Sequence, residues 1–186
     1  MMQGTLAEAQ RWASASGFSV EDPAEPDRGE YEQAVFARIV ALANPTTASL
    51  ALLDRLIEDA ERRTQFGRVI ELLVVRAVTA HRCREGEQAR QSLCRALVYA
   101  QHEGFVQVFL NEGREMQLLL RELARDRTAL EAPTRAYVLN LLTRFPGDSA
   151  AAEAGKTLAE PLTSRQLEIL LLLAEGQSNR EIATQL

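Results

Sequence analysis

The sequence predicts an all-α protein in which antiparallel helix pairs stack into an α-solenoid, followed by a short helix-turn-helix segment. Composition is the first observation: the chain is 46% hydrophobic and 25% charged but only 5% aromatic, and its many Ala, Leu, Arg and Glu residues favour helix. Periodicity is the second, because apolar residues recur at i, i+3, i+4 and i+7 from about Glu30 onwards, as in amphipathic helices. We therefore expect almost no strand.

A first helix is predicted over residues 4–16, with Leu6, Ala9 and Ala13 on one face and Trp12 beside them. The stretch "SGFSVEDPAEPDRGE" that follows carries two prolines, two glycines and five acidic residues. Such a composition ends a packed helix and predicts a loop.

Six further helices are predicted between residues 30 and 145 from their apolar stripes, which begin at Phe36, Leu53, Ile70, Leu93, Met116 and Val138. The segment "NPTT" ends the first of them, Gly67 and Gly86 separate others, and Pro133 stands near the start of the last. Because the connections are short, neighbouring helices should be antiparallel.

An offset of 40 positions aligns the sequence with itself, pairing Val35 with Val75 and Leu53 with Leu93. A helix pair repeated at this length is typical of an α-solenoid, in which each pair buries its apolar face against the next. An irregular helical bundle, in which these matches are coincidental, is the alternative.

Charge and cysteine content limit the classes of function. The net charge of −5 argues against a broad nucleic-acid-binding face. The chain shows neither a membrane-spanning stretch nor a signal peptide, so we expect a cytoplasmic protein without membrane contact. Four possible metal ligands lie within 22 positions but lack the tight spacing of zinc sites, so no metal is expected; they are His81, Cys83, Cys94 and His102.

Residues 147–160 are predicted to be a linker, since "FPGDSAAAEAGKTLAEP" is rich in small residues and has no apolar stripe. The linker contains Gly155, Lys156 and Thr157, but the first glycine of a phosphate-binding loop would fall on Ala150. No nucleotide site is expected there, and no cofactor in this chain.

Residues 161–186, "PLTSRQLEILLLLAEGQSNREIATQL", carry two helix-start signals, Thr163 with Gln166 and Ser178 with Glu181. Each pair has the spacing of a capping box, in which the two side chains satisfy backbone N–H groups at a helix start. Gly176 lies between them, and two short helices joined by a sharp turn are therefore predicted.

This terminal segment resembles the first two helices of the LuxR-type helix-turn-helix. "HEGFVQVFLNEGREMQLLLREL" and "QRWASASGF" are similar to parts of the large MalT-like regulators of that class. The resemblance implies a tetratricopeptide-like repeat domain at 1–146, a linker at 147–160 and an incomplete helix-turn-helix at 161–186.

In such regulators a signalling P-loop ATPase precedes the repeats, the repeats receive a small-molecule inducer or a protein regulator, and the terminal module binds DNA. We expect the ATPase, with its ATP, and the base-reading recognition helix to lie outside this chain. The chain is then a non-enzymatic signal-receiving and coupling fragment, and the full-length protein would activate transcription on inducer binding. The alternative is a free-standing helical-repeat adaptor for a peptide or protein partner.

Two sets of candidate site residues follow. DNA backbone contacts in the full-length protein are expected at the helix starts, although plain capping is an alternative role; these residues are Thr163, Ser178, Asn179 and Arg180. An effector groove could use polar residues of the repeats, although ordinary exposed faces supply the same types; these are Arg76, His81, Arg82, Tyr99, His102 and Asn111. His81 and His102 lack the partners of a catalytic constellation.

Self-association is a further expectation. The helix predicted from Ser164 to Glu175 is apolar nearly all round, and exposing several Leu and Ile side chains is unfavourable. We expect it to dock on a neighbouring surface such as a second copy of the chain. Without a recognition helix, sequence-specific DNA binding by this fragment is not expected.

Overall fold

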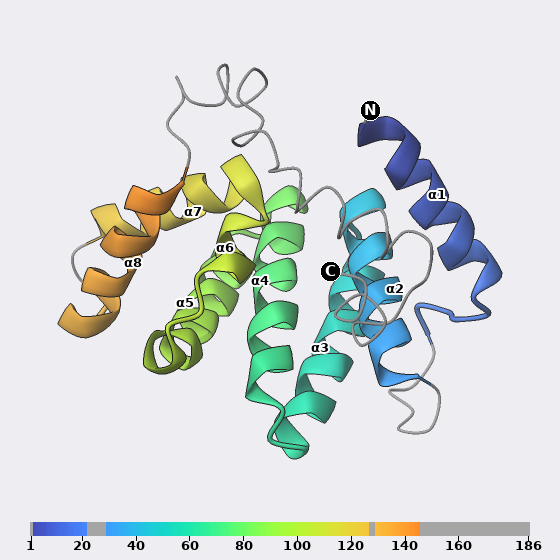
Figure 1. Cartoon of the computed structure of the whole chain (residues 1–186), viewed down its shortest axis with the longest axis horizontal. Coiled ribbons are helices and arrows are strands. Elements are labelled where there is room, and N and C mark those ends of the chain that lie inside the picture. The colour runs from blue at the N-terminus through green and yellow to red at the C-terminus, as the bar shows by residue number, and fades with distance from the viewer. Residues whose placement is uncertain (1, 22–28, 127–128, 146–186) are drawn as a thin grey trace, which may run out of the picture. The chain divides into compact units, whose positions relative to one another are not determined.

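The computed structural model describes residues 2–21, 29–126 and 129–145, and all secondary-structure elements in these ranges are helices (Figure 1). Met1–Phe145 form one compact unit. The predicted linker and helix-turn-helix, with their capping boxes, lie outside the described residues. The helices are α1 (Met2–Ala15), α2 (Glu30–Ala43), α3 (Thr47–Arg62), α4 (Phe66–Arg82), α5 (Gly86–Glu103), α6 (Gln107–Leu110), α7 (Gly113–Arg125) and α8 (Ala132–Arg144).

The 40-residue repeat appears in the helix boundaries. Shifted by 40 positions, α2 falls on residues 70–83 and α3 on 87–102, which match α4 and α5 to within four residues. A second shift carries α4 onto α6 and α7 together, and α5 onto α8. The unit therefore contains three tandem pairs, α2 with α3, α4 with α5, and α6–α7 with α8, as the sequence predicts.

One helix of the third pair is interrupted. Where α2 and α4 are continuous, its counterpart breaks between α6 and α7, and Gly113 adopts a φ of +64° at the break. Glycine has no Cβ to clash in this left-handed region. The sequence did not predict this interruption.

The turns after α3, α4 and α5 repeat one hydrogen bond every 20 residues. The backbone N–H groups of residues 65, 85 and 105 donate to the carbonyls of Ala60, Ala80 and Ala100 at 2.9, 2.9 and 3.2 Å. The preceding residue is left-handed in each turn, with φ values of +57° to +67°; these residues are Thr64, Arg84 and Gly104. This bond closes a helix C-terminus and turns the chain back into an antiparallel neighbour.

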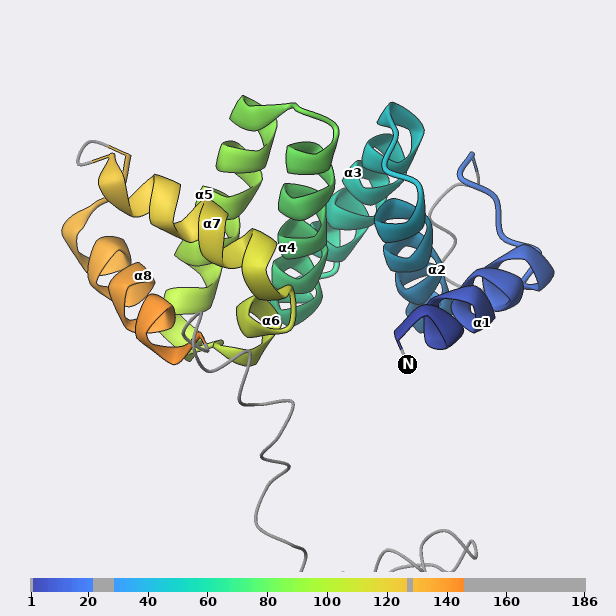
Figure 2. The same ribbon diagram turned by 90° about the horizontal axis from the view of Figure 1, so that it is seen from above.

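The predicted apolar stripes form the core. Leu53, Leu73 and Leu93 recur at 20-residue intervals and are at most 1% exposed. Burying such a side chain stabilises the fold by about 1.5–3 kcal/mol. Helix α4 is the most enclosed, because it lies between α3 and α5 in both views (Figures 1 and 2).

The N-terminal helix agrees with the one predicted at 4–16, and it packs on α2. Ala13 of its predicted apolar face is buried, whereas Trp12 remains 39% exposed. After α1, the Phe18 ring lies against Phe36 of α2 with their centroids 5.7 Å apart. This contact attaches the start of the loop to the first helix pair.

Candidate effector groove

A groove of about 850 Å³ lies along the first helices of the three pairs, α2, α4 and α6. Its wall residues on α2 and on α4 each follow the i, i+3, i+4, i+7 spacing of a single helix face. Leu53, Leu72 and Val75 are nearly fully buried and supply an apolar floor. The residues of the two faces are Tyr31, Ala34, Val35 and Arg38 on α2, and Arg68, Glu71, Leu72 and Val75 on α4.

An ion pair crosses the groove from α2 to the break between α6 and α7. Arg38 Nη2 lies 2.5 Å from Glu112 Oε1, and the Glu112 side chain is only 4% exposed. A buried carboxylate needs such a charged partner, because desolvation penalises an unpaired charge. Arg38, which is 41% exposed, thereby joins the first pair to the third.

A second ion pair reinforces this link. Arg82, at the end of α4, donates to Glu115 of α7 with N–O distances of 2.6 and 2.9 Å. Its Nη1 also donates to the backbone carbonyl of Leu42 on α2 at 2.9 Å. One guanidinium of the second pair therefore bonds to both the first pair and the third.

Arg76 connects α4 to its two antiparallel neighbours. Its guanidinium donates twice to Asp54 of α3, at 2.5 and 3.0 Å, and once to Ser92 of α5 at 2.7 Å. A further, longer bond reaches Gln88. The Arg76 side chain is 14% exposed, so these bonds satisfy a largely buried cation.

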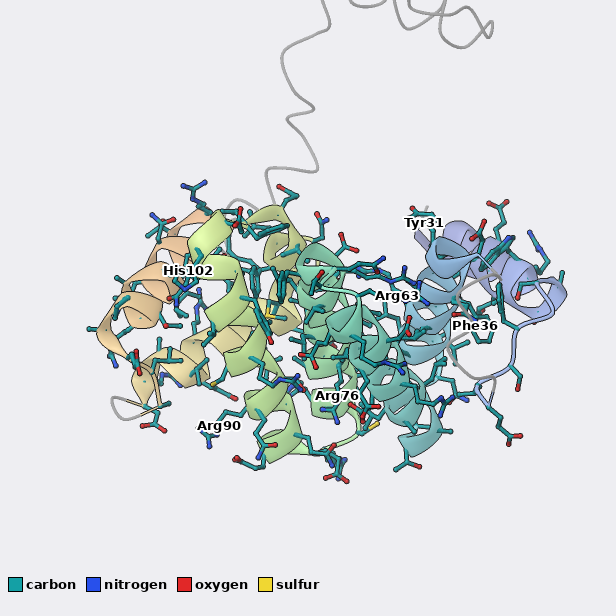
Figure 3. The ribbon with its side chains drawn as sticks, turned by 90° about the horizontal axis from the view of Figure 1, so that it is seen from below. Tyr31, Phe36, Arg63, Arg76, Arg90 and His102 are labelled. Atoms are coloured by element: carbon teal, nitrogen blue, oxygen red, sulfur yellow. The ribbon has the colours of Figure 1, made fainter. Side chains whose placement is uncertain are left out.

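The remaining predicted effector residues lie at separate places. Tyr99 donates to Glu61 at 3.3 Å, and its ring lies 5.6 Å from that of Phe66. His102 is exposed at the end of α5, far from Arg76 and Tyr31 in Figure 3. Asn111 lines the groove, where it accepts from Gln107 at 2.7 Å.

His81 lines a different, smaller cavity. The six predicted residues therefore do not line one cavity, and Asn111 alone among them borders the groove. Their role in effector binding stays a prediction.

Family matches agree with this architecture. Residues 1–126 match the family described as "MalT-like TPR region". The chain belongs to the MalT-like family. Residues 160–186 match "Bacterial regulatory proteins, luxR family". No curated protein and no solved structure matches the chain.

The two matches together are those of a MalT-like transcriptional regulator of the LuxR family, as the sequence predicts. Its LuxR-type domain is DNA-binding in that family. The candidate phosphate contacts, Thr163, Ser178, Asn179 and Arg180, lie outside the described residues, so those roles stay predictions.

In this MalT-like protein, the 40-residue offset indicates which residues line the groove, whereas side-chain chemistry alone does not. Tyr31, Glu71 and Asn111 are separated by 40 positions, and all three line the groove. Val35 and Val75, which identified the repeat, line it too. Equivalent positions of stacked pairs face the same side, so the offset could have located the groove.

In the ranges 2–21, 29–126 and 129–145, no three His, Cys, Asp or Glu residues are grouped so that they could hold a metal ion. No helix in these ranges is long and apolar enough to cross a membrane. Cys83 and Cys94 are half-buried free thiols, and burial raises the pKa of Cys94.

Proposed function

We propose that this chain is the signal-receiving and coupling part of a MalT-like transcriptional regulator, and that the α2–α4–α6 groove binds its small-molecule effector. The groove carries this proposal. Its volume of about 850 Å³ falls within the range of about 300–1,000 Å³ typical of ligand pockets. An apolar floor with a few polar wall groups is also typical of such sites.

The groove is suited to coupling because a ligand within it would contact all three helix pairs. Its lining includes Arg38 of the first pair, Val75 of the second and Glu112 of the third. A ligand that prefers one arrangement of these pairs would shift the equilibrium towards it.

The resemblance to MalT-like regulators supports the remaining parts of the proposal. The full-length protein is proposed to carry an ATP-dependent signalling domain before the repeats and to act in the cytoplasm. Inducer binding is proposed to activate transcription through the DNA-binding module. A protein regulator could use the same groove in place of a small molecule.

The groove can be tested by filling it. Ala34, a half-buried wall residue of α2, is replaced by Phe, and Ala51, an exposed residue of α3, is replaced by Phe as the matched control. Cellular metabolites are then screened by thermal shift against both variants and the unmodified chain. A ligand at about 100 times its dissociation constant adds about 2.7 kcal/mol of stability.

We expect at least one metabolite to stabilise the unmodified chain and Ala51→Phe but not Ala34→Phe. Ala34→Phe in the full-length regulator should abolish induction of a reporter gene. Equal stabilisation of both variants would exclude the groove as the site. If no metabolite stabilises any of the three proteins but Ala34→Phe prevents the binding of a protein partner, the adaptor function is supported instead.

A further inference from the structure

A second cavity lies between the α4–α5 turn and α7, outside the groove. It measures about 210 Å³, and its lining combines an apolar end with charges of both signs. We propose that this cavity binds a small aliphatic α-amino acid. We call it the α7 pocket; it does not depend on the function proposed for the groove.

Three leucines define the apolar end of the α7 pocket. Leu93 comes from α5, and Leu119 and Leu123 come from α7. All three are at most 7% exposed, so their side chains are held by the core. A short branched aliphatic side chain would bury its surface against them, which is favourable at about 25 cal/mol per Å².

The charged lining comes from two helices. Arg90 lies on α5, and its pKa is raised by Glu87 and, to a smaller extent, by Asp126, which directly follows α7. Glu122 lies on α7. A zwitterion presents a carboxylate to Arg90 and an ammonium to Glu122. Hydrogen bonds between charged groups are the stronger class, so this pattern favours a zwitterion over a molecule of single charge.

Two side chains of the lining have polar groups available for such a ligand. Within the described residues, neither the His81 ring nor the Glu122 carboxylate has a hydrogen-bond or ion-pair partner. Arg90 pairs with Glu87 through Nε and Nη2 at 3.0 Å each. That pair is exposed, and exposed pairs contribute little, so a ligand carboxylate can compete for Arg90.

Size restricts the ligand further. At about 210 Å³, the α7 pocket lies below the range of about 300–1,000 Å³ that suits drug-sized ligands. A single amino acid of the size of leucine or valine suits this volume better than a peptide or a nucleotide. The three leucines exclude glycine as a good ligand, because it leaves them without a partner.

The test is titration calorimetry of the whole chain with L-leucine. Three analogues remove one feature each: 3-methylbutylamine lacks the carboxylate, 4-methylpentanoate lacks the ammonium, and glycine lacks the side chain. The variants are Glu122→Gln and Arg90→Gln, with Glu58→Gln on the exposed face of α3 as the control. All three replaced residues are exposed, and circular dichroism verifies that each variant is folded.

We expect L-leucine to bind the unmodified chain and Glu58→Gln equally. Glycine should bind at least about tenfold more weakly, and the two singly charged analogues about threefold more weakly, because the ion pairs that they lack are exposed. Glu122→Gln should weaken the binding of L-leucine about threefold without affecting that of 4-methylpentanoate. Arg90→Gln should do the same for L-leucine without affecting 3-methylbutylamine. No binding of L-leucine at millimolar concentration, or unchanged binding in both pocket variants, would overturn the proposal.

Discussion

Arg76 of α4 and Asp54 of α3 form a two-point ion pair, with Nε–Oδ1 and Nη2–Oδ2 distances of 2.5 and 3.0 Å. This arrangement requires the planar guanidinium, since a lysine ammonium cannot donate along two parallel directions. It also leaves Nη1 free to bond Ser92 of α5, so one side chain connects three helices.

Replacing Arg76 by Lys should therefore lower the free energy of unfolding by about 1–2 kcal/mol, although the positive charge is retained. The control is Arg62→Lys on α3, because Arg62 is 73% exposed in its pair with Asp59. Arg62→Lys should alter the free energy of unfolding by no more than about 0.5 kcal/mol. Urea unfolding measures both, and equal effects would contradict the structural role of Arg76.

Replacing Arg38 by Gln should destabilise the unit by about 2 kcal/mol, because the buried Glu112 carboxylate loses its partner. The double variant Arg38→Gln, Glu112→Gln should recover part of the loss, since no charge is then left unpaired. Arg11→Gln, in an exposed pair with Glu8, should have almost no effect. A double variant no more stable than Arg38→Gln would show that the pair is not coupled.

Replacing Thr64 by Gly should stabilise the unit, because a β-branched residue is strained at a φ of +57°. The left-handed conformation costs about 1–2 kcal/mol per L-residue, and the added freedom of glycine in the unfolded chain offsets roughly half of this. Gly104→Ala, at the equivalent turn, should instead destabilise by about 1 kcal/mol. Thermal unfolding compares the two, and shifts of the same sign would refute the interpretation.

Tyr137 should make stability depend on pH above 10. Burial raises the pKa of Tyr137 from 10 to about 12, and its hydroxyl donates to the backbone carbonyl of Phe105. A raised pKa means that the folded state holds the proton more tightly than the unfolded state. The resulting stability is fully present below pH 10 and is lost as pH rises through about 12.

The measurement is the free energy of unfolding between pH 9 and 12, compared with that of Tyr137→Phe. Tyr137→Phe lacks the hydrogen bond at every pH. Its free energy of unfolding should therefore not show the additional decline above pH 10 that the ionisation of Tyr137 causes. Parallel curves for the two proteins would disprove the assignment. Direct titration of tyrosinate absorbance should show one ionisation near pH 12 that the variant lacks.

The helices were predictable because each carries its own periodic signal. The stripes beginning at Leu53 and Leu93 fall on buried helix faces, and the 40-residue offset agrees with the helix boundaries. The break between α6 and α7 escaped prediction because α6 has only four residues, too few to show a period.

The groove was less accessible to prediction because its polar contacts join distant segments. Arg38 and Glu112 are 74 positions apart. In its local sequence, each is indistinguishable from an ordinary exposed charged residue. The candidates selected by side-chain chemistry, such as Arg76 of α4 and Tyr99 of α5, instead bond to residues of α3. Partners of this kind are determined by three-dimensional packing, which one sequence does not display.

The Arg38–Glu112 pair also affects how the repeats unfold. In a linear repeat array each unit contacts only its neighbours, so terminal units can fray while the middle persists. Here the first pair is tied directly to the third, and Arg82 adds contacts from the second pair to both. Opening one end therefore breaks contacts at the other, and the array should melt in a single cooperative transition.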